Sequence, residues 1–363
     1  MNFILTSCGL SLLTNFLRDN FNILPKEVYK FSNLKKTEIE KDFLALIDKA
    51  VEKLKNQIKK YSNEELRKLS AELNALISFY NGEFNNKDMN YLFVTDTYLG
   101  EVVVDILKDF LISKGLQVQK FIAKDLNTSS LEEFEMALSD VIKDLSEDFE
   151  GYKSSGYEII FNLTGGYKSV NSFLQTMATL WADKSIYIFE SSNELLEIPK
   201  LPLKLDNEIF DKYFEIFKKL EENGVFNEEE LKNIPSSLYI KIDKNYGLSS
   251  WGAIVWEKYK NEYMKKNLIP LIDNVKFSKE FLKDFEKLNP SEKYQINITL
   301  QKLENYILKN ENLKSLRYHS LSGEIAQKYS HEFYPFDGND SRRVFCNEEN
   351  NKIILEKIDD HLK

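Results

Sequence analysis

The chain has 363 residues, more than one hydrophobic core usually holds, so we expect two or three domains. With 42% hydrophobic and 29% charged residues, the composition excludes a disordered chain, and no apolar run is long enough to span a membrane. Cys8 and Cys346 are too few for a disulfide framework, and the N-terminus lacks the basic flank of a signal peptide. The sequence therefore predicts a cytoplasmic protein without a membrane anchor.

The net charge of −9 is unevenly distributed along the chain. Counting along the sequence, residues 274–363 hold 15 basic and 15 acidic side chains, which leaves 34 basic and 43 acidic side chains upstream. Neither part has the basic excess of a free-standing nucleic-acid clamp. If the C-terminal segment acts on RNA, we expect another particle to present the substrate.

Residues 1–204 alternate between β-rich and helical runs. Compact apolar runs predict five strands, at 2–7, 91–96, 116–123, 157–164 and 185–191. Helices are predicted between them at 100–114, closed by Gly115, and at 130–149, opened by Ser130. This alternation predicts a parallel, doubly wound α/β sheet.

The segment 37–81 interrupts the alternation. It carries a long helical pattern that is broken at YSNEE by a capping signature, Ser62 followed by Glu65. We therefore expect a helical hairpin inserted into the sheet domain.

Pro199 and Pro202 mark the end of the first domain, and residues 205–272 form a second region. Its expected elements are helices at 208–222, 227–233 and 250–266, the turn Asn223-Gly224 and the strand-like run LYIKI. This order predicts a small winged-helix-like or helical linker module. The region has more acidic than basic side chains, no arginine and a poor recognition-helix candidate, which does not favour DNA binding.

Residues 273–363 predict a small α+β domain. Phe277, Phe281 and Phe285 recur every four residues, as on one face of a helix, and a second helix is expected from Ser291 to about Asn310. Three strands of an antiparallel sheet are predicted after these helices, at 324–334, 341–347 and 352–358. The turn-forming runs DGND and NEENN join them.

Histidine and arginine are concentrated near the end of the chain. All three histidines and three of the five arginines lie there, namely Arg317, His319, His331, Arg342, Arg343 and His361. Guanidinium binds phosphate through two parallel hydrogen bonds and imidazole titrates near neutrality, so this cluster indicates phosphate chemistry. The histidines lack the spacing and the cysteine partners of a zinc site, so we expect no bound metal.

The strongest local motif is NLTGGYKS, residues 162–169, which follows a hydrophobic strand and precedes a helix. A glycine pair at such a turn lets the backbone approach a ligand, and the helix N-terminus offers free N–H groups to an anion. It is not a P-loop. Two further loops, Thr6–Gly9 and Thr95–Thr97, follow other predicted strands. Loops at the carboxyl ends of neighbouring strands converge, so together they predict a nucleotide site.

TSCGLSLLTN, VTDT and NLTGGYKS occur in the order and spacing of CARF domains, which residues 1–204 resemble. These are Rossmann-like sensors of cyclic oligoadenylate in type III CRISPR immunity. The resemblance implies a homodimer with the ring across its two-fold axis; we expect cyclic tetra-adenylate, with a ring of six as the alternative. The implied ligand-binding residues are Ser7, Cys8, Gly9, Ser11, Thr95, Asp96, Thr97, Asn162, Thr164, Gly165, Gly166 and Lys168.

The usual partner of such a sensor is a HEPN ribonuclease, which carries R-x-x-x-x-H. Positions 314, 326 and 356 hold Lys, Ala and Glu, so that motif is excluded. Residues 273–363 instead are similar to RelE/YoeB-type mRNA interferases, with two helices, SLRYHSLSG, three strands including SRRVF, and the ending EKIDDHLK. This resemblance implies a ribosome-dependent endoribonuclease that cuts mRNA without a metal or cofactor.

In that family the mRNA 2′-hydroxyl attacks the adjacent phosphorus and leaves a 2′,3′-cyclic phosphate and a 5′-hydroxyl end. The resemblance implies that Arg343 contacts the phosphate, that His361 is the general acid and that Lys328 and His331 orient the substrate or supply the base. Arg317, His319 and Arg342 are implied to contact RNA, with Arg342 on the opposite face of the strand from Arg343. The family's terminal aromatic residue is replaced by Leu362 and Lys363, and Tyr329 or Tyr334 are alternatives for base stacking.

The prediction is thus a CRISPR ancillary effector with a sensor domain at 1–204, a linker module at 205–272 and a nuclease domain at 273–363. Two alternatives stay open. One is a ring-controlled transcription regulator that uses 205–272, and the other is a sensor that degrades its own activator through the Thr95–Thr97 and Asn162–Lys168 loops.

Overall fold

The computed structural model describes residues 1–363 except 129–130, 190–193, 310–314, 337–339, 350–351 and 361–363. The chain forms two compact units, Met1–Glu257 and Lys258–Lys363. The region 205–257 therefore belongs to the first compact unit, and the predicted three-part division stays a prediction.

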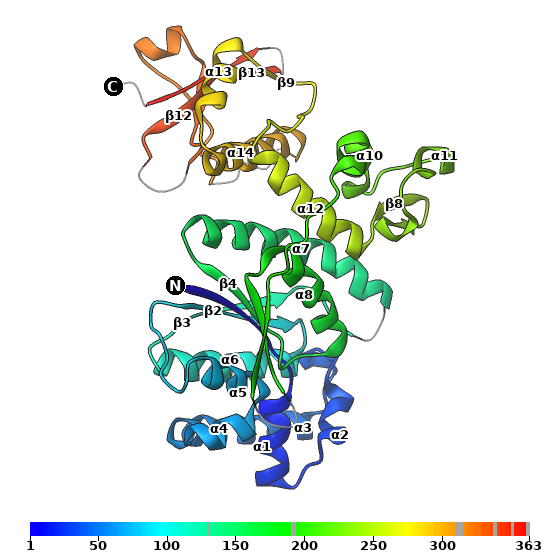
Figure 1. Cartoon of the computed structure of the whole chain (residues 1–363), viewed down its shortest axis with the longest axis vertical. Helices are drawn as coiled ribbons and strands as arrows, with labels where there is room; N and C mark the ends of the chain where they lie inside the picture. Colours follow the sequence, from blue (N-terminus) through cyan, green and yellow to red (C-terminus); the bar gives the residue numbers. More distant parts are fainter. Residues whose placement is uncertain (129–130, 190–193, 310–314, 337–339, 350–351, 361–363) are drawn as a thin grey trace. The chain divides into compact units, whose positions relative to one another are not determined.

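A six-stranded sheet forms the centre of the first unit (Figure 1). Its strands are β1 (Asn2–Ser7), β2 (Met89–Thr95), β3 (Gln117–Ala123), β4 (Glu158–Asn162), β5 (Lys184–Ile188) and β6 (Leu195–Pro199). The order is β3-β2-β1-β4-β5-β6; the first five strands are parallel and β6 is antiparallel to β5. The predicted doubly wound α/β sheet is confirmed. We missed β6 because it is a half-exposed edge strand without a compact apolar run.

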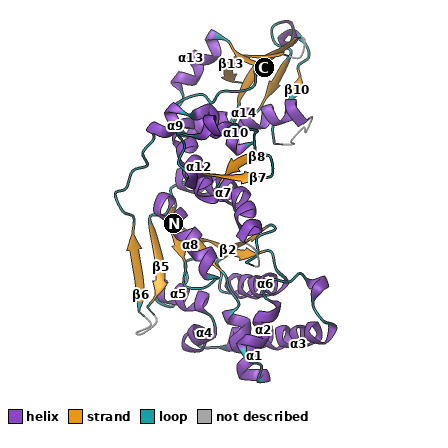
Figure 2. Ribbon diagram, turned by 90° about the vertical axis from the view of Figure 1, so that its right-hand side faces the viewer, coloured by secondary structure: helices purple, strands orange, loops and turns teal. Residues whose placement is uncertain are grey.

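The two faces of this sheet bury different side chains. Ile4, Leu92 and Ile160 point into an aliphatic core formed with α1 (Ser11–Phe21), α6 (Tyr98–Ser113) and the inserted helices. On the other face Phe3 and Phe161 lie 5.9 and 5.2 Å from Phe149, measured between ring centres. Phe149 belongs to α7 (Leu131–Ser154), which covers that face together with α8 (Lys168–Trp181) (Figures 1 and 2). Alternation along the strands therefore gives a sheet that is covered on both faces.

The inserted segment contains more helices than the predicted hairpin. After α2 (Pro25–Val28) come α3 (Lys41–Gln57), α4 (Asn63–Leu69) and α5 (Ala71–Phe79). The capping box of Ser62 and Glu65 opens α4 as predicted. A second break occurs at Ser70, whose extended backbone ends α4 and whose hydroxyl accepts the Leu73 N–H at the start of α5, 3.2 Å away. The hairpin prediction was wrong because this second cap was not recognised.

Residues 205–257 form short helices and a hairpin. The elements are α9 (Glu208–Lys212), α10 (Phe214–Glu221), α11 (Glu228–Leu231), β7 (Tyr239–Ile242), β8 (Asn245–Leu248) and the start of α12 (Ser250–Met264). The predicted helix 208–222 breaks at Tyr213, where φ is −120°. The strand β8 was not predicted. Trp256 packs on Phe217 with ring centres 5.5 Å apart and forms the core of this region.

The second unit packs α13 (Lys279–Lys287) and α14 (Pro290–Lys309) on a five-stranded sheet. The strands are β9 (Val275–Phe277), β10 (His319–Ser320), β11 (His331–Phe333), β12 (Arg342–Glu349) and β13 (Lys352–Asp360). Their order is β10-β11-β12-β13-β9, with β9 parallel to β13 and the other pairs antiparallel. The three predicted strands pair antiparallel as expected. The sheet is nevertheless mixed, because β9, which was not predicted as a strand, adds a parallel edge to β13.

Two element predictions in this unit need correction. Phe277 lies in β9 rather than in a helix, because Ser278 caps α13 by accepting the Phe281 N–H at 3.0 Å. Residues 324–327 form a 3-10 helix instead of a strand, directly after Gly323, where φ is +76°. Lys328 therefore follows a helical turn and does not lie on a strand.

Candidate functional site

The loops after β1 and β4 meet at the point where the strand order of the first sheet reverses. β1 lies between β2 and β4 in the sheet. The chain continues from β1 into α1 on one face and from β4 into α8 on the other, so it leaves these two neighbouring strands toward opposite sides of the sheet. A Cβ atom added to Gly9 would lie 2.8 Å from the backbone nitrogen of Gly166. The two loops thus touch through their backbones, and the predicted convergence of Thr6–Gly9 with 162–169 is found in the structure. In open α/β sheets such a reversal point is where ligands bind.

Gly166 is fixed in a conformation that side chains rarely adopt. Its φ is +88°, and a Cβ atom there would collide with the hydroxyl oxygen of Ser7 and lie 3.0 Å from Oδ1 of Asn171. Ser7 is 1% exposed, and neither its hydroxyl oxygen nor Oδ1 of Asn171 has a hydrogen-bond partner among the described residues. Two buried polar groups without a hydrogen-bond partner among the described residues therefore flank Gly166.

Asn162 and Thr164 shape the β4 loop from within. Asn162 is fully buried; its Oδ1 accepts the Thr164 N–H at 3.3 Å, and the Thr164 hydroxyl oxygen accepts the Ile188 N–H at 3.1 Å. Asn171 of α8 also supports the loop, since its Nδ2 donates to the carbonyl of Gly165 at 2.6 Å. The sequence reasoning missed Asn171 because it is one polar residue inside a helical pattern.

A buried carboxylate, Glu72, lies against both loops. Its Oε1 accepts the Gly9 N–H at 2.7 Å, and its Oε2 accepts the hydroxyls of Ser11 at 2.9 Å and Ser70 at 2.6 Å. A Cβ atom on Gly165 would collide with the same carboxylate. We missed Glu72 because it belongs to α5 of the inserted segment, far from the loop motifs in sequence.

The side chains of the β2 loop are engaged within the protein. Thr97 caps α6 by accepting the Gly100 N–H at 3.3 Å, and its hydroxyl lies 3.3 Å from that of Thr95. Asp96 lies 2.5 Å from the Lys35 ammonium and accepts the Asp125 N–H at 2.8 Å. Burial alone would raise the pKa of Asp96, but these hydrogen bonds bring it below its ordinary value. The predicted ligand residues of this loop therefore bind one another and neighbouring protein groups.

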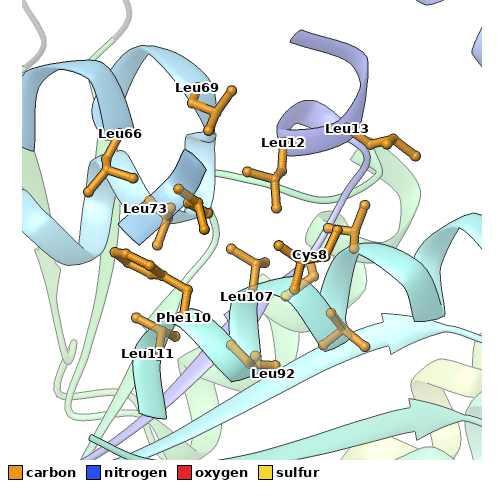
Figure 3. Close-up of a cluster of buried hydrophobic side chains, with 14 of the residues drawn as sticks. Cys8, Leu12, Leu13, Leu66, Leu69, Leu73, Leu92, Leu107, Phe110 and Leu111 are labelled. Carbon is orange, nitrogen blue, oxygen red and sulfur yellow. The ribbon is translucent and has the colours of Figure 1, made fainter. Parts of the chain in front are cut away.

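Two further predicted ligand residues differ in exposure. The side chain of Cys8 lies in the aliphatic core among Leu12, Leu92 and Leu107 (Figure 3), and its N–H donates to the Phe93 carbonyl at 2.8 Å. Burial raises the pKa of its thiol, so the structure does not support a ligand contact by Cys8. Lys168 is exposed at the start of α8, a helix without a side-chain cap.

In the second unit, strand pairing sorts the predicted residues between the two faces of the sheet. His331 lies opposite Cys346, and Phe333 lies opposite Val344, so these side chains share the face that forms the core. Glu332 follows His331 along β11 and therefore points to the other face, where His319 lies opposite it. Arg343 precedes Val344 along β12 and points to that same face.

Five residues gather on the face away from the core, and we call them the Tyr334 cluster: Arg317, His319, Glu332, Tyr334 and Arg343. The guanidinium carbon of Arg343 lies 3.5 Å from the centre of the Tyr334 ring, and that of Arg317 lies 4.9 Å from it. The two cations are thus held against one aromatic ring. Sequence reasoning missed the role of Tyr334 as their common contact.

The other groups of the Tyr334 cluster are also oriented. Nη1 of Arg343 donates to the carbonyls of Asp340 at 3.0 Å and Arg342 at 2.8 Å, whereas its Nε has no partner among the described residues. Nδ1 of His319 lies 2.7 Å from the Arg317 carbonyl, and its Nε2 lies 3.3 Å from Oε1 of buried Glu332. Since a carbonyl only accepts, Nδ1 donates that bond, and the imidazole is held between a carbonyl and a carboxylate.

Arg342 is bound within the protein on the opposite face. Its Nη2 lies 2.7 Å from a carboxylate oxygen of Glu292 and 2.7 Å from one of Asp340, and its guanidinium carbon lies 4.2 Å from the ring centre of Phe336. Hydrogen bonding to Asp340 raises the pKa of Arg342 above its ordinary value. The predicted alternation of Arg342 and Arg343 is confirmed, and the Arg342 guanidinium is bound by Glu292 and Asp340.

Two proposed catalytic residues do not join Arg343. His331 stacks on Tyr318 with ring centres 5.0 Å apart, and its Nε2 lies 3.7 Å from a carboxylate oxygen of Glu348, on the core face. Lys328 is exposed after the 3-10 helix, with its ammonium 5.2 Å from the Tyr329 ring centre. His361 lies outside the described residues. The prediction of a single site with Lys328 and His331 beside Arg343 is not supported.

Within the described residues, no helix is both long and apolar enough to cross a bilayer. Residues 67–201 match the model of a family described as CRISPR-associated protein (Cas_APE2256). Among solved structures, a similar chain is Enterococcus italicus Csm6 bound to cyclic hexa-2′-fluoro-hexa-dAMP, with 16% sequence identity and a TM-score of 0.22. That match covers 66% of this chain and 50% of the Csm6 chain, so the chain spans about half the length of that protein.

Proposed function

We propose that the chain is a CRISPR-associated effector in which residues 1–204 bind a cyclic oligoadenylate and thereby activate a ribonuclease in residues 273–363. The observation that carries the proposal is the contact of the β1 and β4 loops at the reversal point of the first sheet. The family match at 67–201 runs from α4 to just beyond β6 and so includes the β4 loop. A nucleotide site in a CRISPR-associated chain supports a second-messenger sensor.

The sensor is proposed to be a homodimer that binds cyclic tetra-adenylate. The buried Ser7 hydroxyl beside Gly166 still offers hydrogen-bonding capacity at this site. The first turn of α8 offers free N–H groups, and Lys168 adds a positive charge there. Free N–H groups at a helix N-terminus and a nearby ammonium suit a phosphodiester. Asn162, Thr164 and Thr97 act indirectly, because they hold the loops in shape.

The nuclease site is proposed to be the Tyr334 cluster. Cleavage forms a bond from the 2′-oxygen to phosphorus and breaks the bond to the 5′-oxygen, while the 2′-hydroxyl loses its proton and the leaving oxygen gains one. We assign the Arg343 guanidinium to the charge on the phosphorane and Arg317 to a supporting role, and the position of both cations against the Tyr334 ring supports this assignment. His361 stays the proposed general acid.

Ribosome dependence is supported by charge. The C-terminal 90 residues carry equal numbers of basic and acidic side chains, so long-range attraction to RNA is weak and the message must be held by something else. The transcription-regulator alternative is not favoured, because α11 at the centre of the linker region has only four residues, about one helical turn.

The proposal is tested by toeprinting on translating ribosomes with and without cyclic tetra-adenylate. We expect cuts within the ribosomal A site that appear only when the ring is present. A preparation that binds the ring by calorimetry but gives no ring-dependent cut would refute the ribonuclease assignment. A preparation that binds neither a ring of four nor a ring of six would refute the sensor assignment.

A further inference from the structure

Glu72 is a fully buried carboxylate that lies at the proposed nucleotide site. It is 0% exposed, and within the described part of the chain no basic side chain forms an ion pair with it. Its oxygens are satisfied instead by one backbone N–H and two hydroxyls, those of Gly9, Ser11 and Ser70. A buried carboxylate without a cation partner is costly to maintain, and a neutral amide of the same shape could take its place only if both hydroxyls turned to accept. Because this carboxylate lies at a proposed phosphate site, its negative charge points to a role beyond packing.

The donors that Glu72 occupies are those that a phosphate would use. Gly9 lies in the turn between β1 and α1, and Ser11 is the first residue of α1, where N–H groups and the helix dipole attract an anion. The carboxylate also fills the space beside Gly165, as the collision of an added Cβ atom shows. This position is thus held by an anion from the chain itself.

Glu72 also connects the loops to the inserted helices. The Ser11 hydroxyl donates to Glu72 and accepts the Ala71 N–H at 3.0 Å, and the Ser70 hydroxyl donates to Glu72 while it caps α5. The same two hydroxyls therefore tie the α4–α5 junction to the β1 loop. Moving the carboxylate would loosen this junction at the start of α5.

We propose that Glu72 is an internal competitor of the nucleotide phosphate: it holds the donors of the β1 loop in the free protein and is displaced when the ring binds. The inference rests on the proposed sensor function and adds a regulation to it. Displacement sets the ring concentration that the sensor requires and releases the first turn of α5. The junction at Ser70 is then the first segment outside the loops to respond to the ligand.

The test replaces Glu72 by glutamine in the full chain, and calorimetry with cyclic tetra-adenylate measures the affinity. Glutamine keeps an oxygen for the Gly9 N–H, and the hydroxyls of Ser11 and Ser70 can turn to accept from its amide nitrogen. The matched control is Glu64→Gln, which removes the same charge from an exposed residue of the same inserted segment, paired with Lys68.

We expect Glu72→Gln to bind the ring about tenfold more tightly, because a buried like charge no longer opposes the phosphate. Glu64→Gln is expected to bind as the wild type does. Equal or weaker binding by Glu72→Gln would overturn the inference and identify Glu72 as a residue that only positions the loop. Equal gains in both variants would reduce the effect to net charge and also overturn it. If wild type and variants all fail to bind rings of four and six, the sensor function itself fails.

A second measurement needs no variant and keeps the inference testable if Glu72→Gln does not fold. Hydrogen–deuterium exchange of the wild-type chain, with and without cyclic tetra-adenylate, reports on the amides of 70–76. Displacement of Glu72 predicts faster exchange there when the ring is bound, while the 162–169 loop becomes protected. Slower or unchanged exchange over 70–76, together with protection of the loop, would contradict displacement.

Discussion

The two candidate sites of this chain are built in different ways. The loops of the first unit are held by glycines, short buried side chains and backbone contacts, with Gly9 and Gly166 packed against each other. The Tyr334 cluster of the second unit is built from long side chains that come from separate elements and converge on one ring. A site of the first kind leaves a contiguous sequence motif, whereas a site of the second kind depends on strand register. The predictions below test this difference, beginning with the largest expected effect.

Arg343→Ala should abolish message cutting and leave ring binding intact. Removing one group that stabilises the charge of the transition state costs about 100-fold to 1,000-fold in rate, and single-turnover cutting on ribosomes measures the loss. Arg343→Lys should rescue little, because an ammonium lacks the planar face that lies on Tyr334. Cutting at the wild-type rate by Arg343→Ala would remove the Tyr334 cluster from the mechanism.

Gly166→Ala should destabilise the first unit and impair ring binding. The added methyl group requires a strained backbone and collides with Ser7, so we expect a loss of about 2–3 kcal/mol in unfolding free energy, measured by urea denaturation. Gly156→Ala is the matched control, since its φ is also positive, at +81°, but nothing lies within 4 Å of an added Cβ atom. A similar loss of unfolding free energy in both variants would show that the collision with Ser7 does not contribute to the destabilisation.

Arg342→Ala should act on stability. Its loss leaves Glu292 and Asp340 without their shared cation, and we expect the unfolding free energy to fall by about 1–2 kcal/mol at neutral pH. Hydrogen bonding from Arg342 lowers the pKa of Asp340, so this stabilisation is present above the unfolded pKa of about 3.9 and is lost as the pH falls through the folded value. The difference between wild type and variant should therefore shrink below about pH 4; a difference that grows on acidification would contradict the ion-pair account.

Tyr334→Leu should have the smallest effect on cutting. A cation over an aromatic face contributes about 0.5–2 kcal/mol, so misplacing Arg343 is expected to slow cutting by about tenfold. Tyr334→Phe keeps the ring face and should cut at close to the wild-type rate. If phenylalanine and leucine slow cutting equally, the hydroxyl and not the ring face is the functional group.

The sequence predicted the parallel strands of the first unit well because their signals are local. The strands 2–7 and 116–123 have continuous apolar or alternating patterns, and the capping box at Ser62 lies within four residues. Glu72 escaped prediction because its partners Gly9 and Ser11 are about sixty residues away, and only the fold brings them together. No local pattern marks such a contact.

In the second unit the residue types indicated a candidate segment, but the sheet faces on which their side chains lie could not be read from spacing alone. The 3-10 turn at 324–327 and the short strand at His331–Phe333 decide which residues share a side. His331 consequently stacks on Tyr318 on the core face, whereas His319, which was expected to contact RNA, lies in the Tyr334 cluster. A shift of one residue in register exchanges the two faces of a strand, so a residue list without register cannot define such a site.

The central claim is that ligand binding in the first unit controls cutting in the second. The most direct measurement titrates cyclic tetra-adenylate into one preparation of the full chain with translating ribosomes and follows ring occupancy and A-site cutting together. The account predicts that both rise over the same range of ring concentration and that Arg343→Ala keeps the binding curve without the cutting curve. Saturated binding with cutting that stays constant throughout the titration would contradict it.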